Sequence, residues 1–96
     1  MTIKKWYFKN GFEEYKVLYE DECFILVQSI NTKKFSFGMV TDFGSFYGFP
    51  VNQSCLLKNE CIDKLKRFID IDEKYNNLGT CEVWKNMIKK LEEEMI

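Results

Sequence analysis

The spacing of apolar residues changes near the middle of the chain, and this change is the strongest constraint on the fold. Up to residue 41, apolar residues alternate with polar ones or form short runs of β-branched and aromatic side chains, which is typical of strands. From residue 59 onward they recur at intervals of three and four, which is typical of amphipathic helices. We therefore expect a single compact domain over residues 1–96, with 1–50 mainly β and 51–96 mainly α.

The first half contains four candidate strands joined by short polar turns. They are IKKWYFK at 3–9, YKVLYE at 15–20, CFILVQSI at 23–30 and FSFGMVT at 35–41. The dipeptide Asn10-Gly11 suits a type I′ hairpin turn, and Asn31-Thr32-Lys33-Lys34 is a polar turn. Because short turns join neighbouring antiparallel strands, we expect a meander in which 23–30 is a central strand.

The second half predicts two helices. The first covers 59–70, with Ser54 or Asn59 as its cap, and the second follows a break at 76–79 with Thr80 as its cap. Glu92-Glu93-Glu94 opposes the helix dipole, so we expect that end to fray. The fold class is therefore α+β, with an antiparallel meander of about four strands packed against two C-terminal helices. The residues expected to join these helices to the sheet are Leu65, Phe68, Trp84, Ile88 and Leu91.

Charge and composition narrow the function classes. Fourteen basic and fifteen acidic side chains give a net charge of −1, which argues against a generic nucleic-acid binder and against an acidic nucleic-acid mimic. No apolar run approaches the roughly 18 residues of a membrane helix, and the N-terminus lacks a secretory signal, so we expect a cytoplasmic location. Residues with AT-rich codons dominate, as thirteen lysines, one arginine and no alanine show. This indicates an AT-rich source such as a low-GC bacterium or its phage.

The residues that catalysis usually requires are poorly represented. The chain has no histidine, no nucleotide-binding glycine motif and no pair of cysteines at metal-ligand spacing. We expect Cys23 and Cys61 to be buried free thiols, and Cys81, near a helix N-terminus, to be the cysteine closest to a reactive one. The acidic run 70–73 is interpreted as a solvated turn. The sequence thus predicts a protein that is not an enzyme and needs no metal or cofactor.

The stretch KFSFGMVTDFGSFYGFP, residues 34–50, is the most distinctive local feature. Its first part alternates Phe35, Phe37 and Met39 with smaller residues, which indicates the core face of a strand. Its second part has no regular period, and glycines separate its aromatic residues. Because aromatic side chains are enriched at interface hot spots, we expect this second part to contact a partner. The predicted partner-binding residues are Phe43, Phe46, Tyr47 and Phe49.

Three functional hypotheses follow from these features. The leading one is a small protein-binding module, in its most specific form an inhibitor of a host defence system carried by a phage or mobile element. The second is a nucleic-acid-binding module in which Phe35 and Phe37 stack on bases and lysines contact phosphates. Its candidate contacts are Lys4, Lys5, Lys9, Lys33 and Lys34. The third is a small-molecule sensor whose aromatic pocket is closed by residues 42–50. The sequence leaves the partner and the oligomeric state open.

Overall fold

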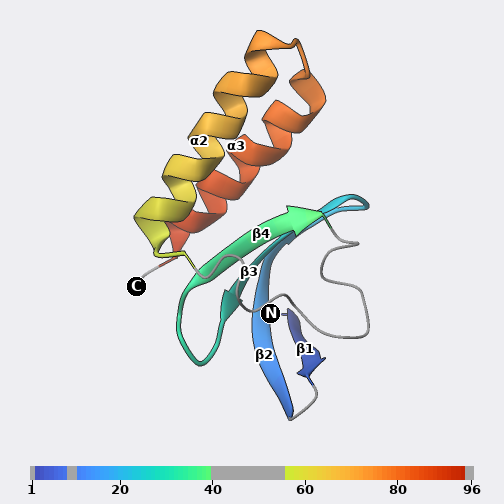
Figure 1. The fold of residues 1–96 in the computed structure, drawn as a ribbon, viewed down its shortest axis with the longest axis vertical. Coiled ribbons are helices and arrows are strands. Elements are labelled where there is room, and N and C mark those ends of the chain that lie inside the picture. The colour runs from blue at the N-terminus through green and yellow to red at the C-terminus, as the bar shows by residue number, and fades with distance from the viewer. Residues whose placement is uncertain (1, 9–10, 40–55, 95–96) are drawn as a thin grey trace.

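The computed structural model describes residues 2–8, 11–39 and 56–94, which form a four-stranded antiparallel sheet followed by a helical hairpin (Figure 1). The strand order β1-β2-β3-β4 is that of a simple meander. This arrangement confirms the predicted α+β fold class. The elements are β1 (Thr2–Phe8), β2 (Gly11–Glu20), β3 (Phe24–Ser29), β4 (Phe35–Met39), α2 (Lys58–Lys74) and α3 (Leu78–Glu93).

The central strands contain one irregularity that matters for packing. Strand β2 pairs with β3 from Tyr15↔Ser29 to Val17↔Val27, and the register then shifts so that Tyr19 faces Leu26. A bulge of this kind adds a residue to one strand and re-aims its side chains. As a result, the neighbouring residues Leu18 and Tyr19 both pack against the core beneath the helices.

Both faces of the central sheet are buried. Leu26 and Phe35 lie beneath the helices, in a core completed by Leu65 and Leu91. The opposite face holds a second cluster of Tyr15, Ile25, Val27 and Val17. This two-sided burial explains why the predicted strand at 23–30 is apolar at consecutive positions. The residues predicted to join helices and sheet are confirmed as core members or as partners packed on it, namely Leu65, Phe68, Trp84, Ile88 and Leu91.

Helix α2 is longer than its apolar stripe suggested. It begins at Lys58, where the Glu60 side chain accepts a hydrogen bond of 2.9 Å from the Leu57 backbone N–H, and it continues to Lys74. The acidic run 70–73 therefore lies inside the helix, and its interpretation as a solvated turn is wrong. Asn76, with a φ of 64°, makes the turn into α3, because asparagine tolerates the left-handed region better than most residues.

The ends of α3 also differ from expectation. The helix begins at Leu78, so Thr80 is in its first turn rather than at its cap. The Thr80 hydroxyl donates a hydrogen bond to the Asp72 carboxylate across the hairpin (2.6 Å). As a helix cap it would instead have accepted a hydrogen bond from a backbone N–H of α3. At the other end α3 continues to Glu93, where we expected fraying. Glu94 forms an ion pair of 2.6 Å with Lys16 of β2, so a lysine from the sheet compensates this acidic terminus.

Candidate interaction surface

The four predicted partner-binding aromatics, Phe43, Phe46, Tyr47 and Phe49, lie outside the described residues, and so does the 42–50 segment of the sensor hypothesis. The strand that precedes them is described. Phe35 is fully buried and Phe37 partly buried beneath the helices, as expected for a core strand. Met39 is different: it is 48% exposed at the end of β4, so its assignment to the core is wrong.

The candidate nucleic-acid lysines are spread over different parts of the sheet. Lys4 and Lys5 are neighbours on β1, so their side chains point to opposite faces. Lys4 forms an ion pair with Glu20 (2.6 Å), and the Lys5 ammonium lies 4.8 Å from the centre of the Phe12 ring. Two further candidates, Lys33 and Lys34, are exposed in the β3–β4 turn, and Lys9 is outside the described residues. The arrangement therefore gives no common face to Lys4 and Lys5.

Cys23 is exposed, so the prediction that it is buried is wrong. The cause lies in the β2–β3 turn. The Asp21 carboxylate accepts hydrogen bonds from the backbone N–H groups of Cys23 (2.8 Å) and Phe24 (2.7 Å). Since an aspartate that captures the N–H groups after it favours a turn over an extended strand, β3 begins only at Phe24.

The other described cysteines are buried. Burial raises the pKa of the Cys61 thiol to about 12, in agreement with the prediction that Cys61 is an inert core residue. Burial also raises the pKa of the Cys81 thiol, and the nearby carboxylates of Asp72 and Glu73 raise it further. Both effects oppose the lowering of the Cys81 pKa that a helix N-terminus could cause, and a reactive cysteine needs a lowered pKa and access to solvent.

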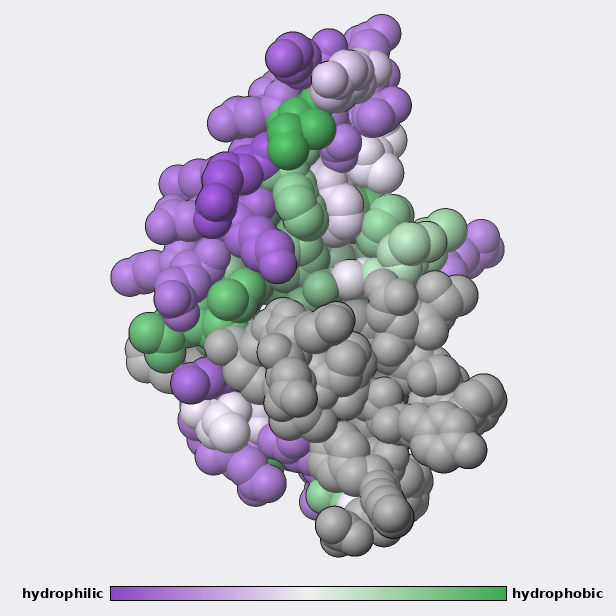
Figure 2. Space-filling model, viewed as in Figure 1, coloured by the Kyte–Doolittle hydropathy of each residue, from purple (hydrophilic) through white to green (hydrophobic). Residues whose placement is uncertain are grey.

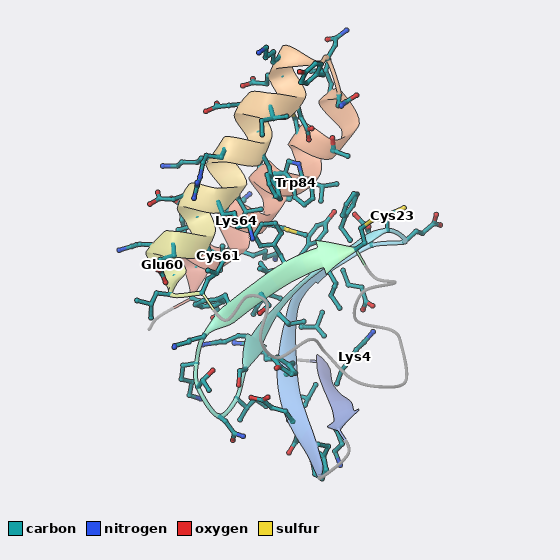
Figure 3. The ribbon with its side chains drawn as sticks, in the orientation of Figure 1. Lys4, Cys23, Glu60, Cys61, Lys64 and Trp84 are labelled. Carbon is teal, nitrogen blue, oxygen red and sulfur yellow. The ribbon has the colours of Figure 1, made fainter. Side chains whose placement is uncertain are left out.

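An open cleft of about 430 Å³ lies between the β2–β3 turn and the start of α3. Figure 3 shows Cys23 on this turn, at the end of the sheet beneath the hairpin, and Trp84 on the hairpin above it. The wall of the cleft is predominantly apolar. The lining residues are Asp21, Glu22, Cys23 and Phe24 from the turn, and Gly79, Thr80 and Val83 from α3.

Two carboxylates, those of Asp21 and Asp72, accept hydrogen bonds that stabilise the segments on either side of this cleft. Asp21 accepts a hydrogen bond from the Tyr19 hydroxyl (2.7 Å), which raises the pKa of Tyr19 to about 12. Burial acts to raise the pKa of Asp21, but the hydrogen bonds that its carboxylate accepts outweigh burial and hold this pKa below its usual value. Asp21 is thus an internal anchor of the turn.

Asp72 has the same role in the hairpin. Its carboxylate accepts hydrogen bonds from the Thr80 hydroxyl and from the indole N–H of Trp84 (2.7 Å), and these bonds lower the pKa of Asp72. The sequence reasoning missed this group. The sequence does contain a signal for it. Asp72, an acceptor, precedes the helix–helix turn, and two donors, Thr80 and Trp84, follow the turn four residues apart and therefore on one side of α3.

The end of the hairpin carries three exposed apolar side chains: Ile71 (51% exposed), Tyr75 (66%) and Leu78 (63%). Ile71 and Tyr75 continue the helical stripe of Phe68, which packs edge-on against Phe37 of the sheet. At 17 residues α2 is about 25 Å long, whereas the five residues of β4 span about 17 Å, so the stripe extends beyond the strand it covers. Figure 1 shows this overhang, and Figure 2 shows apolar residues continuing along it between hydrophilic ones.

Other classes of site gain no support from the part of the chain that the structure describes. No cluster of three or more cysteine or carboxylate side chains in residues 2–8, 11–39 and 56–94 could hold a metal ion. No helix among these residues is long and apolar enough to cross a membrane. The chain matches no protein-family model, and comparisons with curated proteins and with solved structures give no significant match.

Proposed function

We propose that this protein binds another protein through the end of its helical hairpin. We call this region the hairpin-end surface: the exposed residues Ile71, Tyr75 and Leu78 together with the adjoining cleft. The observation that carries the proposal is the cluster of three large apolar side chains within eight consecutive residues, each at least half exposed. Single exposed apolar residues are common on proteins, but clusters of them mark interaction sites.

The shape of the fold supports the same proposal. Phe68, on the same stripe, is packed against the sheet, and Ile69 also packs on the core, so core packing accounts for the apolar residues of α2 up to Ile69. Beyond it, Ile71 and Tyr75 remain exposed, and a partner surface would remove them from water. Tyrosine is also among the residues most enriched at interface hot spots, where its loss commonly costs about 2 kcal/mol or more.

The nucleic-acid alternative has weaker support from the geometry. Stacking requires accessible aromatic faces, whereas Phe35 and Phe37 belong to the helix-side core. The loop aromatics Phe43, Phe46, Tyr47 and Phe49 remain predicted partner contacts, in addition to the hairpin-end surface. The narrower hypothesis, a cytoplasmic inhibitor of a host defence system encoded by a phage or mobile element, is supported by the AT-rich composition alone.

The test is affinity capture from a lysate of the source organism with quantitative mass spectrometry. The bait variant carries Tyr75→Ser and Leu78→Ser. The matched control is Leu57→Ser, because Leu57 is 58% exposed and lies before the opposite end of α2. We expect one protein to be enriched by the wild type and the control but at least about tenfold less by the double variant, the loss expected when hot-spot side chains are removed.

Two results would contradict the proposal. The first is a capture profile that the double variant leaves unchanged relative to the control. The second is captured protein that disappears after nuclease treatment, since it would then be held through nucleic acid. Thermal melts of all baits must coincide within about 3 °C, as expected for exposed substitutions.

A further inference from the structure

We infer that the hairpin-end surface receives a basic amphipathic segment, with apolar residues on one side and lysine or arginine beside them. This inference rests on the proposed function and specifies the chemistry of the partner. Three observations carry it. The two segments that form the cleft are rich in acidic residues, some of these residues are not engaged within the protein, and the cleft itself has an apolar lining.

Negative charge is concentrated in the two segments that build this surface. Residues 20–24 contribute three acidic side chains and no basic one, and residues 70–83 contribute four acidic side chains and a single lysine, Lys74. Glu20 is neutralised by Lys4. Since the whole chain has a net charge of only −1, its charges are segregated, and this surface lies in the acidic part.

The acidic side chains of this surface fall into two groups. Asp21 and Asp72 are engaged by hydrogen bonds inside the protein, and the Lys74 ammonium lies 5.9 Å from the centre of the Tyr75 ring. The remaining acidic side chains are exposed, and within residues 2–8, 11–39 and 56–94 none of them forms a side-chain hydrogen bond or an ion pair. They are Glu22 on the β2–β3 turn, Asp70 and Glu73 on α2, and Glu82 on α3.

The positions of Glu22 and Glu82 relate these charges to the cleft. Glu22 is part of the cleft lining. Glu82 is exposed and follows Gly79 by three residues, so it is a helical neighbour of one lining residue without being part of the lining itself. An apolar side chain that enters the cleft would therefore meet Phe24 and Val83, while a cationic side chain next to it would reach Glu22 on the turn. An amphipathic helix in a groove is a recurrent mode of peptide recognition.

The same charges argue against other occupants. The phosphates of a nucleic acid or of an anionic membrane would face exposed carboxylates, and like charges brought together oppose binding. A second copy of this chain, docked surface to surface, would bring two acidic ends together. A basic and apolar protein segment satisfies both the charge and the apolar lining.

The test uses a synthetic helical peptide of about 14 residues, leucine on one face and lysine on the other, which makes about four turns. Binding to the ¹⁵N-labelled protein is followed by NMR chemical-shift changes at low salt. We expect shifts concentrated in residues 20–24 and 71–83. Glu22→Lys combined with Glu82→Lys should raise the Kd at least about threefold, since two exposed ion pairs are lost. The matched control is Asp63→Lys with Glu92→Lys, two exposed acids elsewhere on the helices with the same change in net charge.

Each outcome bears on the inference. It is overturned if the control pair weakens the peptide as much as the test pair, or if a peptide with glutamate in place of lysine binds as tightly. Shifts of the same residues by a single-stranded oligonucleotide would overturn it too. If capture still depends on Tyr75 and Leu78 while the lysine peptide fails, the proposed function stands and only the basic partner is wrong. If both fail, the hairpin-end surface is not an interaction site.

Discussion

Trp84 is the side chain that ties the hairpin to the sheet, and its removal gives the sharpest test of the packing. It is 7% exposed, and its ring centre lies 4.8 Å from that of Phe24, 5.8 Å from Phe37 and 5.6 Å from Phe68. These partners come from β3, β4 and α2. Trp84→Ala therefore removes a buried ring that contacts three elements, and we expect the free energy of unfolding to fall by about 3–5 kcal/mol.

The assay is urea unfolding followed by far-UV circular dichroism, because a fluorescence signal would be lost with the tryptophan. With a urea dependence of about 2 kcal/mol per M, the midpoint should fall by about 2 M. A loss of this size could unfold a domain whose total stability is about 5–10 kcal/mol. Phe68→Ala is therefore a second variant of the same packing, with a smaller expected loss of stability. Phe68 is half-buried, and its truncation should cost about 2 kcal/mol, below the range for a fully buried ring.

Tyr75→Ala is the matched control, because it truncates an aromatic ring of the same hairpin that is 66% exposed. We expect its stability to stay within about 0.5 kcal/mol of the wild type. A loss below about 1 kcal/mol for Trp84→Ala, or above about 1 kcal/mol for Tyr75→Ala, would refute the reasoning. In either case the division of the hairpin into a packed part and an exposed end would be wrong.

Three further predictions concern chemistry and binding. In native protein with Cys55→Ser, Cys23 should react with a thiol reagent much faster than Cys61, and equal rates would contradict their assigned exposure. The carboxylate of Asp72, whose pKa is lowered on folding, should stabilise the fold above its ordinary pKa of 3.8. This contribution is lost as the pH falls through the lowered pKa, so Asp72→Asn should make acid unfolding followed by circular dichroism less steep, and an unchanged curve would contradict this. Phe46→Ala and Tyr47→Ala should weaken capture of the partner without lowering the melting temperature. If the two variants unfold instead, both rings belong to the core and the prediction is wrong.

The fold class could be predicted from the sequence because each half of the chain has its own spacing of apolar residues. Alternation is typical of a strand with one buried face, and intervals of three and four are typical of a helix with one buried face. Consecutive apolar residues at 25–27 signalled a central strand, which the structure shows to be buried on both faces, and the spacing of Leu65 and Phe68 signalled a helix packed on that sheet. These signals are local. A side chain at a given position in a strand or helix points in a known direction, whatever the rest of the chain does.

The errors come from contacts between residues far apart or from competition for backbone hydrogen bonds. Cys23 precedes an apolar run and so resembles a strand residue, but Asp21 captures its N–H and holds it in the turn. Asp72 resembles a solvated acid until the hairpin brings Thr80 and Trp84 to it. The hairpin-end surface was missed for the same reason, because the length of α2 relative to the sheet decides where its stripe becomes exposed.

The central claim is that a partner protein contacts the hairpin-end surface, and site-specific photo-crosslinking in cells of the source organism tests it most directly. A benzoyl-phenylalanine in place of Tyr75 should form a covalent adduct with one protein on irradiation. The same residue in place of Leu57, which is similarly exposed before the opposite end of α2, should not form that adduct. Adducts of the same protein from both positions, or none from position 75, would contradict the account.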